Sequence, residues 1–228
     1  MTDDVTDEDD ISTIDSLRAL ALEHGFDYRD ADSSLVDRWG APPFTELGHR
    51  RALDVVTGER NGFDVVAFRF VVGERERTGN AVAGYGGGLS LRLPERLQAY
   101  LVVAAALPGP LPRFSLVPHE DAVDEVPFGY GFECEDPDLA ERYEVYAADP
   151  ETAGAVLHLD AVTAIREHRT VDWRIEGRDL IAVDPLGEDE RSVSDVLATI
   201  DALTTIARGI PSDTYSRFKA PSGYPPPA

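Results

Sequence analysis

The chain has 228 residues, of which 43% are hydrophobic, so it can build a sizeable packed core and does not have the composition of a disordered protein. Its 43 Asp and Glu residues outnumber 21 Lys and Arg residues, which gives a formal net charge of -22. Nucleic acid and anionic lipid both need positive charge on the protein to displace counterions. We therefore expect neither a nucleic-acid partner nor a membrane partner.

The acidic residues are spread along the whole chain, and Lys219 is the only lysine. Carboxylates in every segment, with Arg in place of Lys, are typical of a halophilic protein in a cytoplasm of high salt. Concentrated salt screens the self-repulsion that this charge would otherwise cause. A second interpretation, a protein partner with a basic face, stays open.

Cys134 is the only cysteine, so one chain can form neither an internal disulfide nor a zinc site built from several thiolates. The first residues, MTDDVTDEDD, have the wrong charge for a signal peptide. No apolar run approaches the roughly 20 residues that span a bilayer. These features predict a soluble, cytoplasmic protein.

The chain is expected to begin with a disordered acidic arm over residues 1–10, which has too few apolar residues to offset its ordering entropy. Apolar residues at helical spacing then predict an amphipathic helix over residues 13–24, with Gly25 at its end. The segment that follows has mixed signals. Trp39 and Phe44 are expected to anchor it to the core.

Residues 53–72, LDVVTGERNGFDVVAFRFVV, predict two strands joined at Asn61-Gly62, because these two residues accept the positive φ of a tight turn. The second strand is apolar on both faces. This indicates a position in the middle of a sheet that is covered on both sides. Arg69 is the exception, and it marks either the end of the cover or an ion pair within it.

The glycine-rich residues 84–88 could cradle a phosphate through backbone N–H groups. Neither phosphate-loop spacing, GxxxxGK[ST] or GxGxxG, is present, so we interpret this stretch as a flexible loop. The sequence also predicts a buried strand bounded by PGPLP and three shorter strands after it. These four strands are expected at residues 99–107, 113–117, 128–134 and 142–147.

The second half of the chain contains helix-start signals and one more alternating pattern. Asp149 before Pro150 is expected to cap a short helix, and Asp160 a second one. Residues 171–183, VDWRIEGRDLIAV, predict a second hairpin. Its turn is expected at Gly177. Ser192 begins the final helix, whose apolar stripe continues to about residue 208.

Together these elements predict an α+β fold. We expect a mainly antiparallel sheet of about seven strands, an N-terminal helix, two short helices and a C-terminal helix. A disordered arm (1–10), a single α+β domain (11–211) and a Pro-rich flexible tail (212–228) are the expected divisions of the chain.

The succession VVTGERNGFDVVAFRF, LPRFSLVP, RYEVYAADPETAGAVL and DWRIEGRDLIAV, followed by a terminal helix, resembles a family of uncharacterised prokaryotic conserved hypothetical proteins of haloarchaeal type. The resemblance covers residues 44–211, and it implies one continuous folded unit. It carries over no activity and no functional residue.

Few residues suggest chemistry. His158, Asp160 and His168 would form a metal or hydrolytic site if the two short helices folded back on each other, although a histidine near a helix end is more often a capping or surface residue. Cys134 beside Glu133 could act as a nucleophile, but a cysteine that alternates with Phe and Tyr is typically a small buried hydrophobe. We expect no metal, no cofactor and no catalytic residue.

Two functions from different classes therefore remain. The favoured one is a non-catalytic module that binds a protein or ligand, and the alternative is a hydrolase or metal-dependent enzyme that uses His158, Asp160, His168 or Glu133. The candidate binding residues lie in the second predicted hairpin. There, alternation places Ile181 and Val183 on the face that Arg174 makes polar, and apolar residues in that setting need cover from the protein's own helices, a partner or a second copy.

Overall fold

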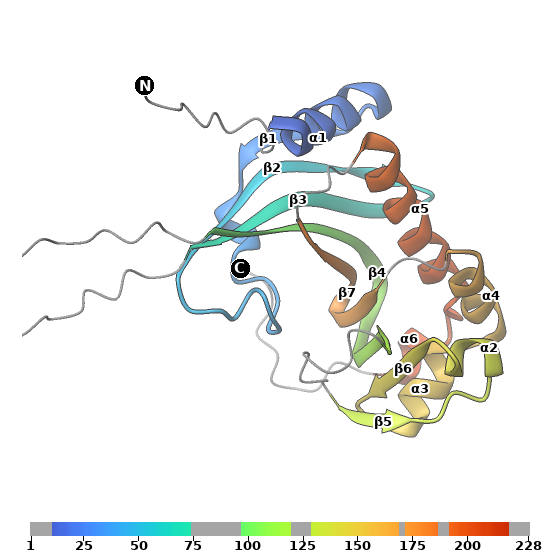
Figure 1. Cartoon of the computed structure of the whole chain (residues 1–228). Helices are drawn as coiled ribbons and strands as arrows, with labels where there is room; N and C mark the ends of the chain where they lie inside the picture. The colour runs from blue at the N-terminus through green and yellow to red at the C-terminus, as the bar shows by residue number, and fades with distance from the viewer. Residues whose placement is uncertain (1–10, 74–96, 120–128, 169–171, 187–191, 219–228) are drawn as a thin grey trace, which may run out of the picture.

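The structure is a computed structural model that describes residues 11–73, 97–119, 129–168, 172–186 and 192–218. Figure 1 shows the arrangement of its elements. The helices are α1 (Ile11–His24), the 3-10 helix η1 (Ser33–Leu35), α2 (Pro137–Ala140), α3 (Pro150–Val156), α4 (Leu159–Glu167), α5 (Val193–Gly209) and α6 (Thr214–Arg217). The strands are β1 (Asp27–Ala31), β2 (His49–Arg60), β3 (Phe63–Gly73), β4 (Leu97–Pro118), β5 (Tyr130–Phe132), β6 (Tyr143–Ala147) and β7 (Trp173–Pro185).

All seven strands belong to one antiparallel sheet. Their order is β1-β2-β3-β4-β6-β5, and β7 pairs with the other edge of β4. The predicted α+β class, with its N-terminal and C-terminal helices, is confirmed. The expected arm over residues 1–10 and the glycine-rich residues 84–88 lie outside the described residues, and the division of the chain into arm, domain and tail stays a prediction. Within the expected tail, residues 214–217 form α6.

Strand β4 is 22 residues long and is the partner that β3, β6 and β7 share. Its first half pairs with β3, its second half pairs with β6, and β7 runs beside both halves. The ladder with β7 shifts register on both sides of the Leu111–Gly177 pair. The sheet therefore bends at this point without losing the continuity of either strand (Figure 1).

The predicted break at PGPLP and the predicted hairpin at Gly177 are both wrong. Proline lacks an N–H group and therefore interrupts the hydrogen bonds between strands. In this protein, however, β4 continues past the prolines as one strand. Gly177 has a φ of 65°, and this conformation forms an irregularity in β7 opposite the prolines instead of a turn. Arg178 donates a hydrogen bond of 3.1 Å to the carbonyl of Pro108 and ties the two irregular segments together.

The β2–β3 hairpin turns at Asn61-Gly62, as predicted, with φ values of 56° and 86°. This turn is fastened to α5. Arg60 donates two hydrogen bonds of 2.8 and 2.9 Å to the Asp201 carboxylate, and the Asn61 amide donates to the same carboxylate at 3.0 Å. The hairpin tip and the C-terminal helix are thereby held in one arrangement.

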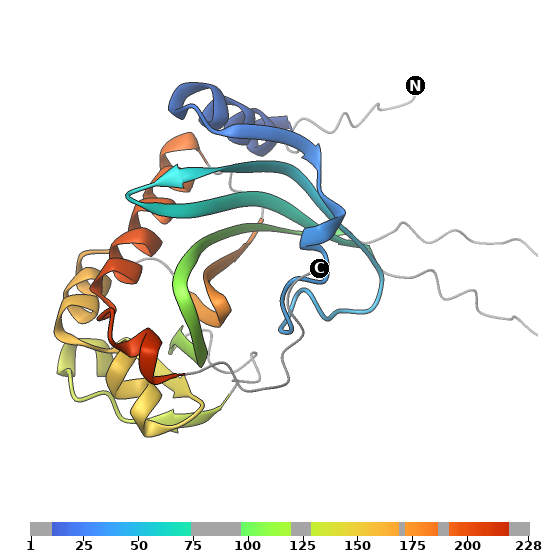
Figure 2. The same ribbon diagram turned by 180° about the vertical axis from the view of Figure 1, so that it is seen from behind.

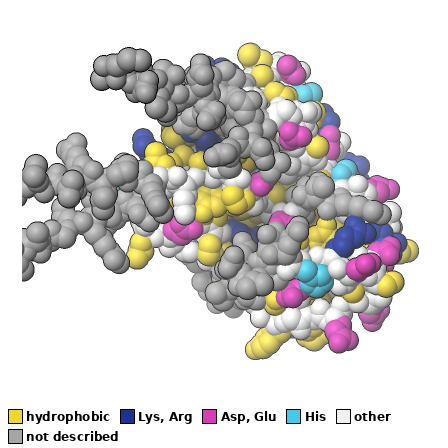
Figure 3. Space-filling view, viewed as in Figure 1, with side chains coloured by type: hydrophobic (Ala, Val, Ile, Leu, Met, Phe, Trp, Pro, Cys, Tyr) yellow, Lys and Arg dark blue, Asp and Glu magenta, His cyan; other side chains and the backbone are white. Residues whose placement is uncertain are grey.

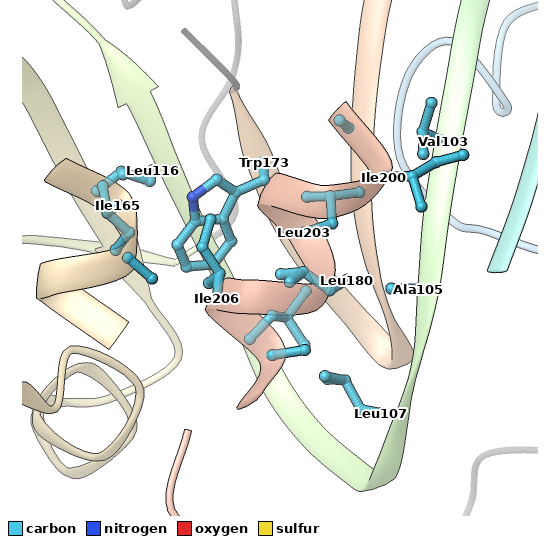
Figure 4. Packing of buried hydrophobic residues seen from close by; sticks show 14 of the residues in the cluster. Val103, Ala105, Leu107, Leu116, Ile165, Trp173, Leu180, Ile200, Leu203 and Ile206 are labelled. Carbon is cyan, nitrogen blue, oxygen red and sulfur yellow. The ribbon is translucent and has the colours of Figure 1, made fainter. Parts of the chain in front are cut away.

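Helices α1, α4 and α5 cover one side of the sheet, which we call the helical face (Figures 1 and 2). In Figure 4, Ile200, Leu203 and Ile206 of α5 lie among the side chains of β4 and β7. Near α4, Trp173 stacks on Phe114 with ring centroids 5.2 Å apart. Burial of apolar surface stabilises the folded state by about 25 cal/mol per Å². The packing on the helical face therefore supplies much of the stability.

The helix-start signals are mostly confirmed. Asp149 caps α3 through the Thr152 N–H, and Ser192 with Asp195 forms a capping box at α5. The start predicted at Asp160 is wrong, because α4 begins after His158. Asp160 instead lies in the first turn, where a carboxylate meets the positive end of the helix dipole.

The contact between Asp201 and the hairpin predicts a dependence of stability on pH. The hydrogen bonds from Arg60 lower the pKa of Asp201 below its ordinary value, so the stabilisation is present above the unfolded pKa of about 3.9 and is lost as the pH falls through the lower folded pKa. We expect Asp201→Asn to lower the free energy of unfolding by about 1 kcal/mol at pH 7.

This difference should shrink in acid, below about pH 4, when urea unfolding of the two proteins is compared at fixed KCl. Asp213→Asn is the matched control, because Asp213 pairs with Arg217 in solvent and both side chains are more than half exposed. A difference that stayed constant through the acid range would contradict the assignment to Asp201.

Candidate ligand pocket beside the cover segment

The other side of the sheet, which we call the second face, is covered by irregular chain. Residues 33–47, the cover segment, bring Leu35, Trp39 and Phe44 against β2, β3 and β4. Trp39 stacks on Phe68 with ring centroids 5.9 Å apart and an interplanar angle of 7°, and Phe44 meets the edge of Phe70 at 4.8 Å. The expectation that Trp39 and Phe44 anchor this segment is confirmed, since both side chains are buried.

Three charged side chains of β7 hold the cover segment in place. Asp179 accepts hydrogen bonds of 3.0 and 2.9 Å from the Arg38 guanidinium and one of 2.9 Å from the Trp39 indole N–H. Glu176 accepts a hydrogen bond of 2.8 Å from the Gly40 N–H. Arg174 in turn donates to Glu176 at 2.8 Å and reaches the cover segment's Pro42 carbonyl at 2.7 Å. Arg174, Glu176 and Asp179 of β7 thus all contact the segment that covers the strand.

A pocket of about 290 Å³ lies beside Arg38 of the cover segment, toward the β2–β3 hairpin. Arg38 and Asp179 form the wall on the side of the cover segment, and Asp27 and Asp64 line the pocket as well. The floor contains Val66, Ala104 and Ala106 together with β2 residues. The lining residues are Asp27, Arg38, Thr57, Gly58, Asp64, Val65, Val66, Ala104, Ala106 and Asp179.

The pocket exists because the side chains on the second face become smaller toward the hairpin. Phe68 and Phe70 fill the space under the cover segment, whereas the neighbouring positions carry Val66 on β3 and two alanines on β4. The register places the lining residues side by side, with Asp27 opposite Thr57, Thr57 opposite Val66, Val66 opposite Ala104 and Ala106 opposite Asp179. Residues directly opposite one another in a sheet share a face.

Some of the charged side chains around the pocket form ion pairs and others do not. Arg38 and Asp179 neutralise each other through a bidentate ion pair, in which the Asp179 side chain is 10% exposed. Asp27 and Asp64 have no hydrogen-bond or ion-pair partner among the described residues. The lining therefore carries three carboxylates and one guanidinium, an excess of negative charge beside an apolar floor.

The residues predicted to bind lie beside this pocket or under the cover segment. Ile181 is fully buried and stands opposite Ala104 of the pocket floor, Val183 is half-buried in the same layer, and Arg174 lies over the ring of Phe44. Their assignment to the face opposite Leu180 and Ala182 is confirmed. The cover that alternation required is the protein's own chain, supplied by residues 33–47 with the short 3-10 helix η1, and not by the C-terminal helix or by α3 and α4. A role of Arg174, Ile181 and Val183 in binding stays a prediction.

The residues of the alternative catalytic reading do not come together. His158 and His168 flank the nine residues of α4 at its two ends, about 15 Å apart at 1.5 Å per residue. Glu133 is exposed and precedes α2. Within the described ranges, no group of three or more His, Cys, Asp and Glu side chains is arranged to hold a metal ion.

Cys134 is half-buried and packs against the hydrophobic core of the helical face. Its burial raises the pKa of the thiol, so the reactive thiolate is disfavoured at neutral pH. This agrees with the reading of Cys134 as a small hydrophobe.

A second group of buried polar side chains lies under α1. Arg69 pairs with Asp54 at 3.1 Å, and both side chains are about one-tenth exposed. Asp54 also accepts a hydrogen bond of 2.8 Å from Tyr28, and a bulge in β2 with a φ of 54° at Asp54 directs its side chain to them. The prediction of an ion pair within the cover is therefore confirmed for Arg69. Because these charged groups satisfy one another, the group is structural.

Sequence reasoning did not identify the pocket. Its residues come from β1, β2, β3, β4, β7 and the cover segment, and Asp179 was expected beside a hairpin turn. The signal that was available is the alternation of Asp172, Arg174 and Glu176, which marked a polar face on β7.

Comparison with known proteins adds information about the fold. No family model matches the chain, and no curated protein matches its sequence. A solved structure with a similar fold is that of the mycobacterial trehalose monomycolate transport factor A, TtfA, with a TM-score of 0.58 and 16% sequence identity. The match covers 88% of this chain and 97% of that chain. The likeness is one of fold. In the part of the chain that is described, no helix has the length and apolarity required to cross a membrane.

The position of Ile181 generates a prediction about folding. Ile181→Asp places an unpaired carboxylate in a fully buried site and removes the isoleucine contacts, so it should cost about 4 kcal/mol or more and unfold the protein. Val183→Asp is the matched control, because Val183 is half-buried and its carboxylate can reach water. Circular dichroism and urea unfolding measure the difference. An Ile181→Asp protein that folded normally but lost association in light scattering would support a binding face instead.

Proposed function

We propose that this protein is a non-catalytic ligand-binding module of a high-salt cytoplasm, and that the pocket between the cover segment and the β2–β3 hairpin holds the ligand. The observation that carries the proposal is the pocket itself: a cavity of about 290 Å³ with an apolar floor and charged walls. Ligand sites are typically concave, mostly apolar and equipped with a few polar groups that orient the ligand.

The wall of the pocket on the side of the cover segment is preorganised. Arg38 and Asp179 are fixed by their bidentate ion pair, and Trp39 fixes Asp179 from behind. The floor belongs to three neighbouring strands of the sheet. A ligand would therefore meet groups that are already ordered, which lowers the entropic cost of binding.

The catalytic alternative has less support. Catalysis needs polar groups within about 3 Å of a common point, and His158 and His168 lie at opposite ends of α4. The structurally similar protein is named a transport factor. That name agrees with binding as the function proposed for this chain.

Binding at the pocket can be tested without knowledge of the ligand. We expect a mixture of small organic fragments to shift the backbone amide signals of Thr57, Gly58 and Asp64 in amide proton–nitrogen correlation spectra. Ala106→Leu should abolish these shifts, because the larger side chain occupies the pocket. Ala198→Leu on the exposed side of α5 is the matched control. Shifts that persist in Ala106→Leu, or that never occur in the unmodified protein, would contradict the proposal.

The high-salt part of the proposal rests on the net charge of -22 and on the distribution of the acidic groups. Figure 3 shows Asp and Glu side chains spread over one side of the molecule instead of gathered in one patch. A spread of this kind serves solvation and repels itself at low salt.

The melting temperature should therefore rise steeply between low and molar KCl, as the screening length falls from about 10 Å at 0.1 M to about 3 Å at 1 M. Thermal unfolding followed by circular dichroism measures this, with sucrose of equal osmolality as the control for a non-ionic effect. If the melting temperature were independent of KCl, the high-salt assignment would be wrong.

A further inference from the structure

We infer that the pocket selects a small organic cation, an alkylammonium or guanidinium group that carries a short apolar body. This inference rests on the proposed function and specifies its ligand class. Three features of the pocket lead to it: its charge, its floor and its size.

Charge decides the sign of the ligand. The Arg38 guanidinium donates from Nε and Nη2 to Asp179, so its charge is already balanced by one of the three pocket carboxylates. An anion would also meet the carboxylates of Asp27 and Asp64, which have no partner among the described residues. Both carboxylates are exposed, so their repulsion acts on an anion that approaches the margin of the pocket. The same carboxylates attract a cation.

The floor decides that the cation is organic. Val66, Ala104 and Ala106 offer methyl groups and no oxygen ligands from their side chains, whereas hard metal ions need six or more oxygens. The carboxylates stand at the margin, on β1 and β3, and the apolar residues lie between them and β7. An ammonium group at the margin can thus place its hydrocarbon part over the alanines.

Salt adds a further constraint. In molar KCl the attraction between exposed charges is strongly screened, and potassium ions compete for the carboxylates. Burial of apolar surface is not weakened by such screening. A ligand that combines a cationic head with an apolar body can keep its affinity under these conditions. The volume of about 290 Å³ limits that ligand to a small molecule.

Three probes with four carbon atoms each test the inference: butylammonium, butyrate and butanol. They are titrated into the full-length protein at fixed KCl, with the Thr57, Gly58 and Asp64 amides as the readout. We expect butylammonium to bind, and the double variant Asp27→Asn, Asp64→Asn to weaken it about tenfold or more because both attracting charges are lost. Asp30→Asn is the matched control on β1, since the Asp30 side chain is 90% exposed and does not line the pocket.

The outcomes separate the inference from the proposed function. Butylammonium binding that is lost in both Ala106→Leu and the double Asp→Asn variant supports both. Equal binding of butanol or butyrate, still blocked by Ala106→Leu, overturns the choice of a cation and leaves the pocket as a ligand site. If no probe shifts the amide signals, or if the shifts are the same in Ala106→Leu, the ligand site and the cation are both refuted.

Discussion

The ladder between β4 and β7 is the constraint on which the rest of the structure depends. β4 carries β3 on one half and β6 on the other, so the two parts of the sheet share a single strand. β7 follows both halves and brings Trp173 into the core near α4 while it brings Ile181 under the cover segment. The irregular segments around the prolines of β4 and around Gly177 of β7 lie opposite each other. The sheet therefore bends there, and neither strand ends.

The elements that sequence reasoning found are those whose cause is local. Asn61-Gly62 needs only its own two positive φ values, and the Ser192–Asp195 capping box needs one helical turn. The errors at PGPLP and Gly177 have the opposite origin. By itself PGPLP looks like the end of a strand and Gly177 looks like a turn. Each is held open by the other strand, through contacts between residues about 70 positions apart, as in the hydrogen bond from Arg178 to Pro108.

The candidate site shows the same division. Alternation on β7 correctly predicted that Ile181 and Val183 face away from Leu180 and Ala182 and need cover. It could not predict that the cover is residues 33–47, because Asp179 and Arg38 are separated by 141 positions and no residue pattern joins them. The pocket depends on an absence of bulk at Ala104 and Ala106, and alanine in a strand gives no signal of its own.

The ion pairs of the second face differ from those on the surface in how strongly salt screens them. Exposed pairs such as Arg217 with Asp213 are screened and contribute little. The carboxylates that hold the cover segment are shielded from solvent: the Glu176 side chain is 6% exposed and that of Asp179 is 10% exposed, while the Arg38 partner of Asp179 is 35% exposed. Buried pairs are screened much less, and removal of one partner leaves an uncompensated charge in the protein. Salt therefore relieves the repulsion on the surface while it leaves the attachment of the cover segment, and with it the pocket wall, in place.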